Sequence, residues 1–156
     1  MKNLKIMVTG DLGYIGSVLA PLLVKRGYEV AGLDIGYFAD CLLGLTQENH
    51  KRHFKDIRNV SSEDMRGIGA VIHLAGLSND PAGALRPELT EQINLDATVR
   101  LGQLAKSVGV RRFIYASSQS MYGISSSSEE LDEDSSEKLP LTTYARTKWE
   151  AEIALK

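Results

Sequence analysis

The sequence is poor in cysteine and histidine, with one cysteine (Cys41) and three histidines among 156 residues. A single thiol cannot close an internal disulfide, and the dispersed histidines do not have the spacing of a zinc site. These shortages exclude a disulfide scaffold and a structural zinc centre. A chain of this size buries roughly two-thirds of its unfolded surface, so we expect one domain, 1–156, with its own core.

Long apolar runs are also missing. The longest near the start are 6–8 and 18–24, and the second contains Pro21. Both are far shorter than the ~20 residues of a membrane span. The first residues lack the apolar core of a secretory signal. We therefore expect no membrane partner and a cytoplasmic location.

The formal net charge of −2 is unevenly distributed. The segment 129–137 holds six acids and no base, which leaves the rest of the chain mildly basic. No stripe of clustered Lys and Arg is present, so we expect no nucleic-acid partner. We expect the Ser-rich, acidic stretch 125–137 to be a solvated loop, which we favour over an electrostatic lid.

Hydrophobic patterning predicts alternating strands and helices. The predicted strands are 4–8, 28–33, 53–55, 70–75 and 112–116, and the predicted helices are 15–25, 61–66 (capped by Ser61), 89–108 and 142–156. The uniformly apolar run 70–75 is typical of a buried parallel strand. The alternation predicts an α/β fold with a doubly wound parallel sheet. Since a full dinucleotide-binding sheet commonly has six strands, we expect at least one edge strand to be absent.

A glycine-rich turn separates the first predicted strand from the first predicted helix. Gly10, Gly13 and Gly16 follow one another at intervals of three. In this context the first glycine permits a tight turn, the second lets the backbone approach a pyrophosphate, and the third lets helix and strand pack closely. The free N–H groups of the helix start then face the phosphates. The alternative is that these glycines only form a turn.

Asp34 stands at the end of the second predicted strand. A carboxylate there accepts hydrogen bonds from ribose hydroxyls and repels a 2′-phosphate, which favours NAD over NADP. The alternative is a surface turn aspartate, because Asp is common in turns.

Tyr144 and Lys148 lie four residues apart, which places a phenol and an ammonium on one helix face. A nearby positive charge favours the phenolate, which makes Tyr144 a candidate general base. As an isolated pattern, the pair is better explained as two solvated side chains.

Taken together, the motifs resemble the extended short-chain dehydrogenase/reductase family, in particular its nucleotide-sugar epimerases and dehydratases, over essentially the whole chain. The matching segments are TGxxGxxG at 9–16, D-I-R at 56–58, H-x-A-G at 73–76, the helix asparagine Asn94, S-x-x-x-Y-G at 118–123 and YxxxK at 144–148. The resemblance implies a Rossmann fold that binds NAD and acts on a nucleotide sugar.

The resemblance also implies a role for each matching residue. Tyr144 would remove a sugar hydroxyl proton, Lys148 would hold the nicotinamide ribose, and Ser118 would hydrogen-bond the reacting oxygen. Asn94 would help to hold Lys148; its alternative is a polar residue on the solvated side of a helix. We interpret His73 as a core or strand-end residue. The implied cofactor-binding residues are Gly10, Leu12, Gly13, Tyr14, Ile15, Gly16, Asp34, Asp56, Ile57, Leu74, Ala75, Gly76, Tyr144 and Lys148.

Within the family, the pair Gln119 and Ser120 favours an epimerase, because the 4,6-dehydratases carry Asp-Glu there. A reductase or decarboxylase stays open. Family members are longer, so we expect an N-terminal part that is truncated after the catalytic helix, retains cofactor contacts and turns over substrate poorly. The family also implies a homodimer through the helices holding Asn94 and Tyr144. The alternative function is a non-catalytic, NAD-sensing binding protein, since a fold does not fix a function.

Overall fold

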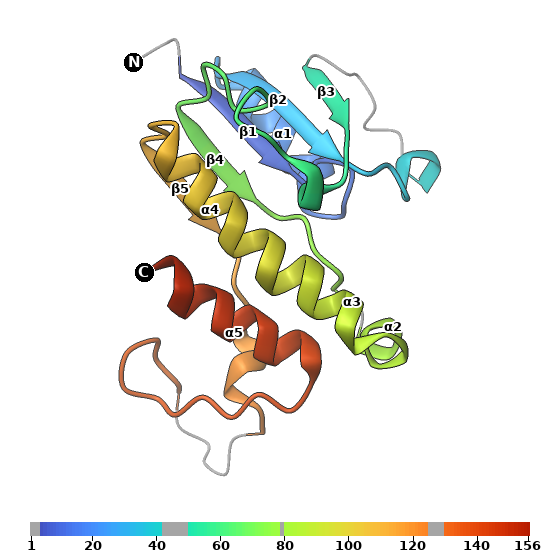
Figure 1. Cartoon of the computed structure of the whole chain (residues 1–156), viewed down its shortest axis with the longest axis vertical. Coiled ribbons are helices and arrows are strands. Elements are labelled where there is room, and N and C mark those ends of the chain that lie inside the picture. Colours follow the sequence, from blue (N-terminus) through green and yellow to red (C-terminus); the bar gives the residue numbers. More distant parts are fainter. Residues whose placement is uncertain (1–3, 42–49, 79, 125–129) are drawn as a thin grey trace.

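The computed structural model describes residues 4–41, 50–78, 80–124 and 130–156 (Figure 1). Part of the acidic stretch expected to be a loop, 125–129, lies outside the described residues. Within the described ranges, no helix is long and apolar enough to cross a membrane. The same ranges contain no group of three or more His, Cys, Asp or Glu side chains able to hold a metal ion.

A five-stranded, wholly parallel sheet forms the centre of the fold. Its strands are β1 (Lys5–Thr9), β2 (Glu29–Asp34), β3 (Lys51–Phe54), β4 (Ala70–His73) and β5 (Arg112–Tyr115), in the order β3-β2-β1-β4-β5. The chain runs outward from β1 to β3 on one side and continues from β4 to β5 on the other. The topological switch point therefore lies between β1 and β4, and all carboxyl ends share one edge. The predicted fold class is confirmed.

Alternate residues of β1 supply two cores, one on each face of the sheet. Ile6 and Val8 pack with Ala20 of α1 (Gly16–Lys25), whereas Met7 packs with Leu101 and Ala105 of α4 (Ala97–Ser107). This alternation follows from the two-residue period of a strand. Figure 1 shows α4 across the near face of the sheet and α1 behind it.

The predicted helix 89–108 is interrupted in the structure. It comprises α3 (Pro87–Glu91), a π-helical turn η3 (Gln92–Asp96) and α4. A further short helix, α2 (Asp80–Leu85), was not predicted. The last helix, α5 (Thr143–Leu155), agrees with the prediction and lies beside α4 in Figure 1.

The predicted helical turn at 61–66 is wrong. The segment forms successive turns that Gly67, with φ of 75°, ends before a helix can form. The Asp64 carboxylate accepts hydrogen bonds from the backbone N–H and hydroxyl of Ser61 and from Lys55 Nζ. The Ser61 hydroxyl therefore donates to Asp64 and caps no helix. The remaining short helices are η1 (Ala39–Cys41), η2 (Ile57–Asn59) and η4 (Gln119–Tyr122).

Candidate cofactor and catalytic site

The glycine turn lies at the carboxyl end of β1 and leads into α1. Gly10 has φ of 75°, and a Cβ there would stand 2.7 Å from the backbone nitrogen of Ala75. A Cβ at Gly16 would collide with the carbonyl oxygen of Gly10. Only glycine fits these two positions, because a Cβ at either would overlap backbone atoms of a neighbouring segment. Leu74 and Ala75 lie against this turn; their contact with the cofactor stays a prediction.

The start of α1 exposes two large apolar side chains. Tyr14 is 96% exposed and Ile15 is 59% exposed, while Leu12 is buried. Gly13 donates its N–H to the Gly10 carbonyl. The predicted residues of the turn therefore lie together between β1 and α1, with Tyr14 and Ile15 outermost.

Asp34 joins the end of β2 to the glycine turn. Its carboxylate accepts hydrogen bonds from the backbone N–H of Leu12 at 3.1 Å and from that of Gly36 at 2.7 Å. The side chain is thus held beside the turn, where it fits the ribose role. The hydrogen bond from Gly36, two residues further on, is typical of an aspartate in a turn, so this alternative accounts for part of the geometry, and the ribose contact stays a prediction.

Asp56 and Ile57 follow β3. The Asp56 carboxylate accepts from the backbone and guanidinium of Arg58, whose hydrogen bonds lower the pKa of Asp56. Ile57 is buried in the core. If an adenine amine binds Asp56, as the resemblance implies, it would share the carboxylate with Arg58.

Ser118 follows β5 and starts η4. Its Oγ accepts from the backbone N–H of Ser120 at 3.2 Å and lies 2.8 Å from Ser120 Oγ. Ser120 therefore fixes the orientation of the Ser118 hydroxyl. The neighbouring Gln119 is exposed.

Tyr144 and Lys148 lie one turn apart on α5, which is capped by Thr142. Tyr144 is half-buried, and Lys148 is only 8% exposed. Burial lowers the pKa of Lys148 to about 8. The Lys148 ammonium lies 4.1 Å from the ring centroid of Tyr115. A solvated pair is therefore a wrong description of Lys148.

Asn94 lies in the π-helical turn and is buried. Its amide oxygen accepts from the Leu77 N–H at 2.8 Å and its amide nitrogen donates to the Leu77 carbonyl at 2.9 Å. The alternative of a solvated asparagine is therefore wrong. Gly76 lies against the same amide oxygen, so Asn94 fixes the segment after β4. Its assistance to Lys148 stays a prediction.

His73 is buried in β4, which agrees with its interpretation as a core or strand-end residue. Its Nδ1 lies 2.6 Å from Thr9 Oγ1 and its Nε2 lies 2.8 Å from Thr98 Oγ1. Burial, with a smaller effect of the Lys148 charge, lowers the pKa of His73 to about 3. The ring is therefore neutral at physiological pH and is not a base.

Sequence reasoning missed Asp11, which lies inside the glycine turn. Its side chain is fully buried and pairs with His50 at 2.9 Å and with Arg52 at 2.7 Å. A charged residue between two glycines was the available signal. Its partners come from the β3 region, which the patterning could not place against the turn.

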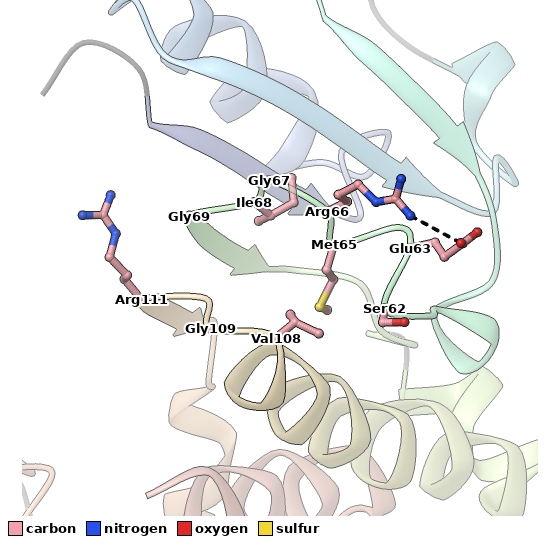
Figure 2. Close-up of a pocket in the computed structure, with 10 residues that line it drawn as sticks. All are labelled: Ser62, Glu63, Met65, Arg66, Gly67, Ile68, Gly69, Val108, Gly109 and Arg111. Carbon is pink, nitrogen blue, oxygen red and sulfur yellow. Dashed lines mark hydrogen bonds and ion pairs between the residues drawn. The ribbon is translucent and has the colours of Figure 1, made fainter.

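A pocket of about 580 Å³ lies at the opposite, amino-terminal edge of the sheet. Figure 2 shows the residues that line it. The pocket lies between the segment before β4 and the turn from α4 to β5. Arg66 and Arg111 do not converge there, and Arg66 contacts Glu63 at 3.5 Å. Since ligand sites carry converging polar groups, and open α/β sheets bind at their carboxyl edge, this pocket is not the candidate site.

Comparison with known proteins identifies the family of this chain. The family described as NAD dependent epimerase/dehydratase matches residues 6–156. A UDP-glucuronate 4-epimerase of Thermodesulfobacterium geofontis is 32% identical, over 94% of this chain and 49% of that protein.

Two solved structures have the same fold. A UDP-N-acetylglucosamine 4-epimerase from Methanobrevibacter ruminantium M1 has a TM-score of 0.88 at 27% identity, covering 99% of this chain and 50% of that one. An NAD-dependent NDP-hexosamine 5,6-dehydratase of tunicamycin biosynthesis has a TM-score of 0.85 at 27% identity, covering 96% and 48%.

These matches define an NAD-linked Rossmann protein, in agreement with the predicted fold and the predicted family. The chain belongs to the NAD-dependent epimerase/dehydratase family. It spans about half the length of the relatives named above.

Proposed function

We propose that this chain is the NAD-binding part of a nucleotide-sugar epimerase and carries its catalytic residues. The main support is that the glycine turn and the candidate catalytic residues lie at the same edge of the sheet. The glycine turn follows β1, and Ser118 follows β5, with Tyr144 and Lys148 on the adjoining α5. In open α/β sheets, ligands bind across this edge at the switch point.

The residues present fit NAD. Gly10 and Gly16 let the turn pack closely against Ala75 and against the start of α1, whose free backbone N–H groups would face the pyrophosphate. Asp34 offers a carboxylate to the adenosine ribose and would repel a 2′-phosphate, so NAD is favoured over NADP. When bound, NAD supplies a hydride acceptor for oxidation of a sugar carbon.

The chain's own residues would carry the proton chemistry. The Tyr144 phenol would take the proton of the sugar hydroxyl as a general base, and the Ser118 hydroxyl would donate a hydrogen bond to the reacting oxygen. The Lys148 ammonium would bind the nicotinamide ribose and favour the phenolate of Tyr144. The Tyr144 phenol would return the proton to the same oxygen when the sugar carbon is reduced on its other face.

The residues after Ser118 favour epimerisation over dehydration. Elimination of water requires an acid or base near the neighbouring carbon, and Gln119 and Ser120 supply no carboxylate. Ser120 instead bonds to Ser118. Similarity to 4-epimerases of UDP sugars supports a UDP sugar as the substrate class.

Titration of the chain with NAD, followed through its single tryptophan, Trp149, and by calorimetry, tests the cofactor step. We expect weak, saturable binding that a Gly10→Ala variant loses and that NADP does not match. Equal affinity for NADP, or no loss in the variant, would contradict the cofactor assignment.

A hydride-transfer assay with UDP-glucose tests the reaction. We expect little turnover from the 156-residue chain and clear turnover from a chain lengthened along its reading frame, because remote substrate contacts orient the reacting sugar. Equal turnover by both would refute the idea that the chain is one part of the enzyme.

A Tyr144→Phe variant separates the enzyme from an NAD sensor. In the lengthened enzyme it should lose turnover by at least ~10²-fold while the affinity for NAD is retained. A sensor has no use for the phenol and would respond to NAD unchanged, with no turnover in either form.

The homodimer through the helices holding Asn94 and Tyr144 stays a prediction. Sedimentation of the chain at several concentrations tests it. A monomer at all concentrations would contradict it for this chain.

A further inference from the structure

Three groups from different parts of the fold form a column beside the catalytic helix. The His73 and Tyr115 rings are stacked, with centroids 5.8 Å apart and an interplanar angle of 25°. On Tyr115 lies the ammonium of Lys148, 4.1 Å from the ring centroid. The column therefore joins β4, β5 and α5.

The base of this column is fixed. Both ring nitrogens of His73 are hydrogen-bonded, one to Thr9 at the end of β1 and the other to Thr98 on α4. A neutral ring held at both nitrogens cannot turn without breaking a buried hydrogen bond. Thr9 immediately precedes Gly10, so the column begins at the glycine turn.

Lys148 has no carboxylate partner within the part of the chain that the structure describes. The carboxylates of its surroundings are engaged elsewhere: Glu91 on α3 binds Arg146, and Glu152 on α5 binds Ser117 and Lys156. The ring of Tyr115 is thus the group that compensates a buried cation. Such contacts stabilise a desolvated cation more than an exposed one.

We propose that Tyr115 is a positioning residue for Lys148: its ring, held by His73, is a cation platform that fixes the ammonium toward the nicotinamide ribose of NAD. The ribose contact rests on the proposed function, whereas the platform itself does not. Because the ring face attracts the cation by its charge and receives only the N–H that points at it, the other ammonium donors stay available for ribose hydroxyls.

The Tyr115 hydroxyl supports this assignment to the ring. It is buried and has no hydrogen-bond partner among the described residues. Burial, together with the neighbouring Tyr144 and Glu152, raises the pKa of Tyr115. The phenol therefore stays protonated and takes no part in acid–base chemistry.

The titratable groups around Lys148 allow a clean measurement. They are neutral His73 on β4, Tyr115 on β5 and Tyr144 on its own helix, while Glu88 on α3 and Asp96 on η3 are exposed. Burial lowers the pKa of His73 to about 3 and raises the pKa of Tyr115, so neither ring titrates near the pKa of Lys148. A titration around that pKa reports on Lys148.

The experiment is NMR titration of the chain labelled with ¹³C and ¹⁵N at lysine, with the Lys148 signal assigned by its loss in Lys148→Met. We expect Tyr115→Leu to raise the acid dissociation constant of Lys148 by about tenfold, because the cation loses the ring. Tyr115→Phe keeps the ring and should leave the constant unchanged. An unchanged or lowered constant in Tyr115→Leu would overturn the proposal.

The wild-type chain provides a check that needs no variant to fold. Protons on the Lys148 ε-carbon should resonate upfield of those of the exposed Lys106, because they lie over a ring. Absence of this upfield displacement would equally overturn the platform.

Affinity for NAD separates this inference from the proposed function. We expect Tyr115→Leu to weaken NAD binding about tenfold and Tyr115→Phe to restore it. If Tyr115→Leu shifts the Lys148 titration while the wild type binds no NAD, the platform stands and the proposed function fails. If NAD binds and the titration does not move, the platform fails alone.

Discussion

Each end of the candidate site buries an ionisable side chain, but the two charges are stabilised by different kinds of partner. Asp11, beneath the glycine turn, is paired with both His50 and Arg52. Lys148, on α5, has no carboxylate partner in the described part of the chain and lies over the ring of Tyr115. The charge of Asp11 is neutralised by salt bridges, whereas the charge of Lys148 is stabilised by a ring face.

Under the proposed function, the difference separates a structural charge at Asp11 from a charge at Lys148 that would contact the cofactor. Removal of one partner from a buried ion pair leaves an uncompensated charge and costs stability. A buried cation without a carboxylate costs stability already in the native state, as its lowered pKa shows. Mutation should therefore destabilise the chain at Asp11 and stabilise it at Lys148.

The largest expected effect is at Asp11. Asp11→Ala leaves Arg52 and His50 buried beside an empty space, and should lower the free energy of unfolding by about 3–5 kcal/mol, measured by urea denaturation. The exposed carboxylate of Asp40 is the matched control, and Asp40→Ala should change stability by less than ~0.5 kcal/mol. A similar small loss in both variants would show that the Asp11 cluster contributes no net stability.

Lys148→Met should act in the opposite direction. At pH 7 the free energy of unfolding should rise by about 1–3 kcal/mol, because an apolar side chain of similar length replaces a buried cation. Affinity for NAD should fall at the same time, since the ribose loses its donor. Lys106→Met, at an exposed position of α4, is the control and should change neither quantity.

The pH dependence of the wild type tests the sign of this effect. The pKa of Lys148 is about 8 in the fold and about 10.4 in the unfolded chain, so between these values only the unfolded chain holds the proton. The cost in stability of burying the charged Lys148 ammonium is fully present below pH 8. Above pH 8 this cost decreases, so the free energy of unfolding rises with pH. The difference between Lys148→Met and wild type should shrink from pH 7 to pH 10. A constant difference would contradict this account.

His73 is a third buried ionisable group, and it extends the comparison to the acid side. Its pKa is about 3 in the fold against about 6.5 in the unfolded chain. Above pH 6.5 the contribution of neutral His73 to the free energy of unfolding is therefore complete. It declines as the pH falls toward 3, by up to about 1.4 kcal/mol per pH unit.

His73→Gln, which is neutral and can still hydrogen-bond, should reduce this slope. The carboxylates of Asp56, Asp64 and Glu152, whose pKa values are also lowered, act in both proteins and cancel in the difference. His53→Gln, on the exposed face of β3, is the control and should leave the slope nearly unchanged. Equal slopes in wild type and His73→Gln would show that His73 protonates in the fold.

Local patterns predicted much of this molecule. The glycine turn, Asp34 beside it, and Tyr144 with Lys148 on one helix depend on spacings of a few residues or on one βαβ unit. Such spacings determine which side chains share a face, because side-chain direction repeats with a fixed period in a strand and in a helix. The sheet class followed from the same alternation.

The features that were missed depend on contacts between distant segments. Arg52 reaches Asp11 only because β3 pairs with β2, and Gly32 of β2 leaves space for the Asp11 carboxylate. Likewise, Tyr115 meets Lys148 because α5 lies over the end of β5. The π-helical turn at Asn94 was hidden because it keeps a helical apolar pattern while adding a residue to the turn.

The smallest predicted effect concerns the start of α5, where Thr142 Oγ1 accepts a hydrogen bond from the Ala145 N–H at 3.1 Å. Thr142→Ala should lower the free energy of unfolding by about 1 kcal/mol, since one backbone donor at the helix start loses its acceptor. Thr142→Ser keeps the acceptor and should recover most of this loss. Neither variant changes the surroundings of Lys148, so its titration measured by NMR should not move. If Thr142→Ala changed the pKa of Lys148 as much as Tyr115→Leu does, that pKa would depend on the general stability of α5. The contrast between Lys148 and Asp11 would then have no basis.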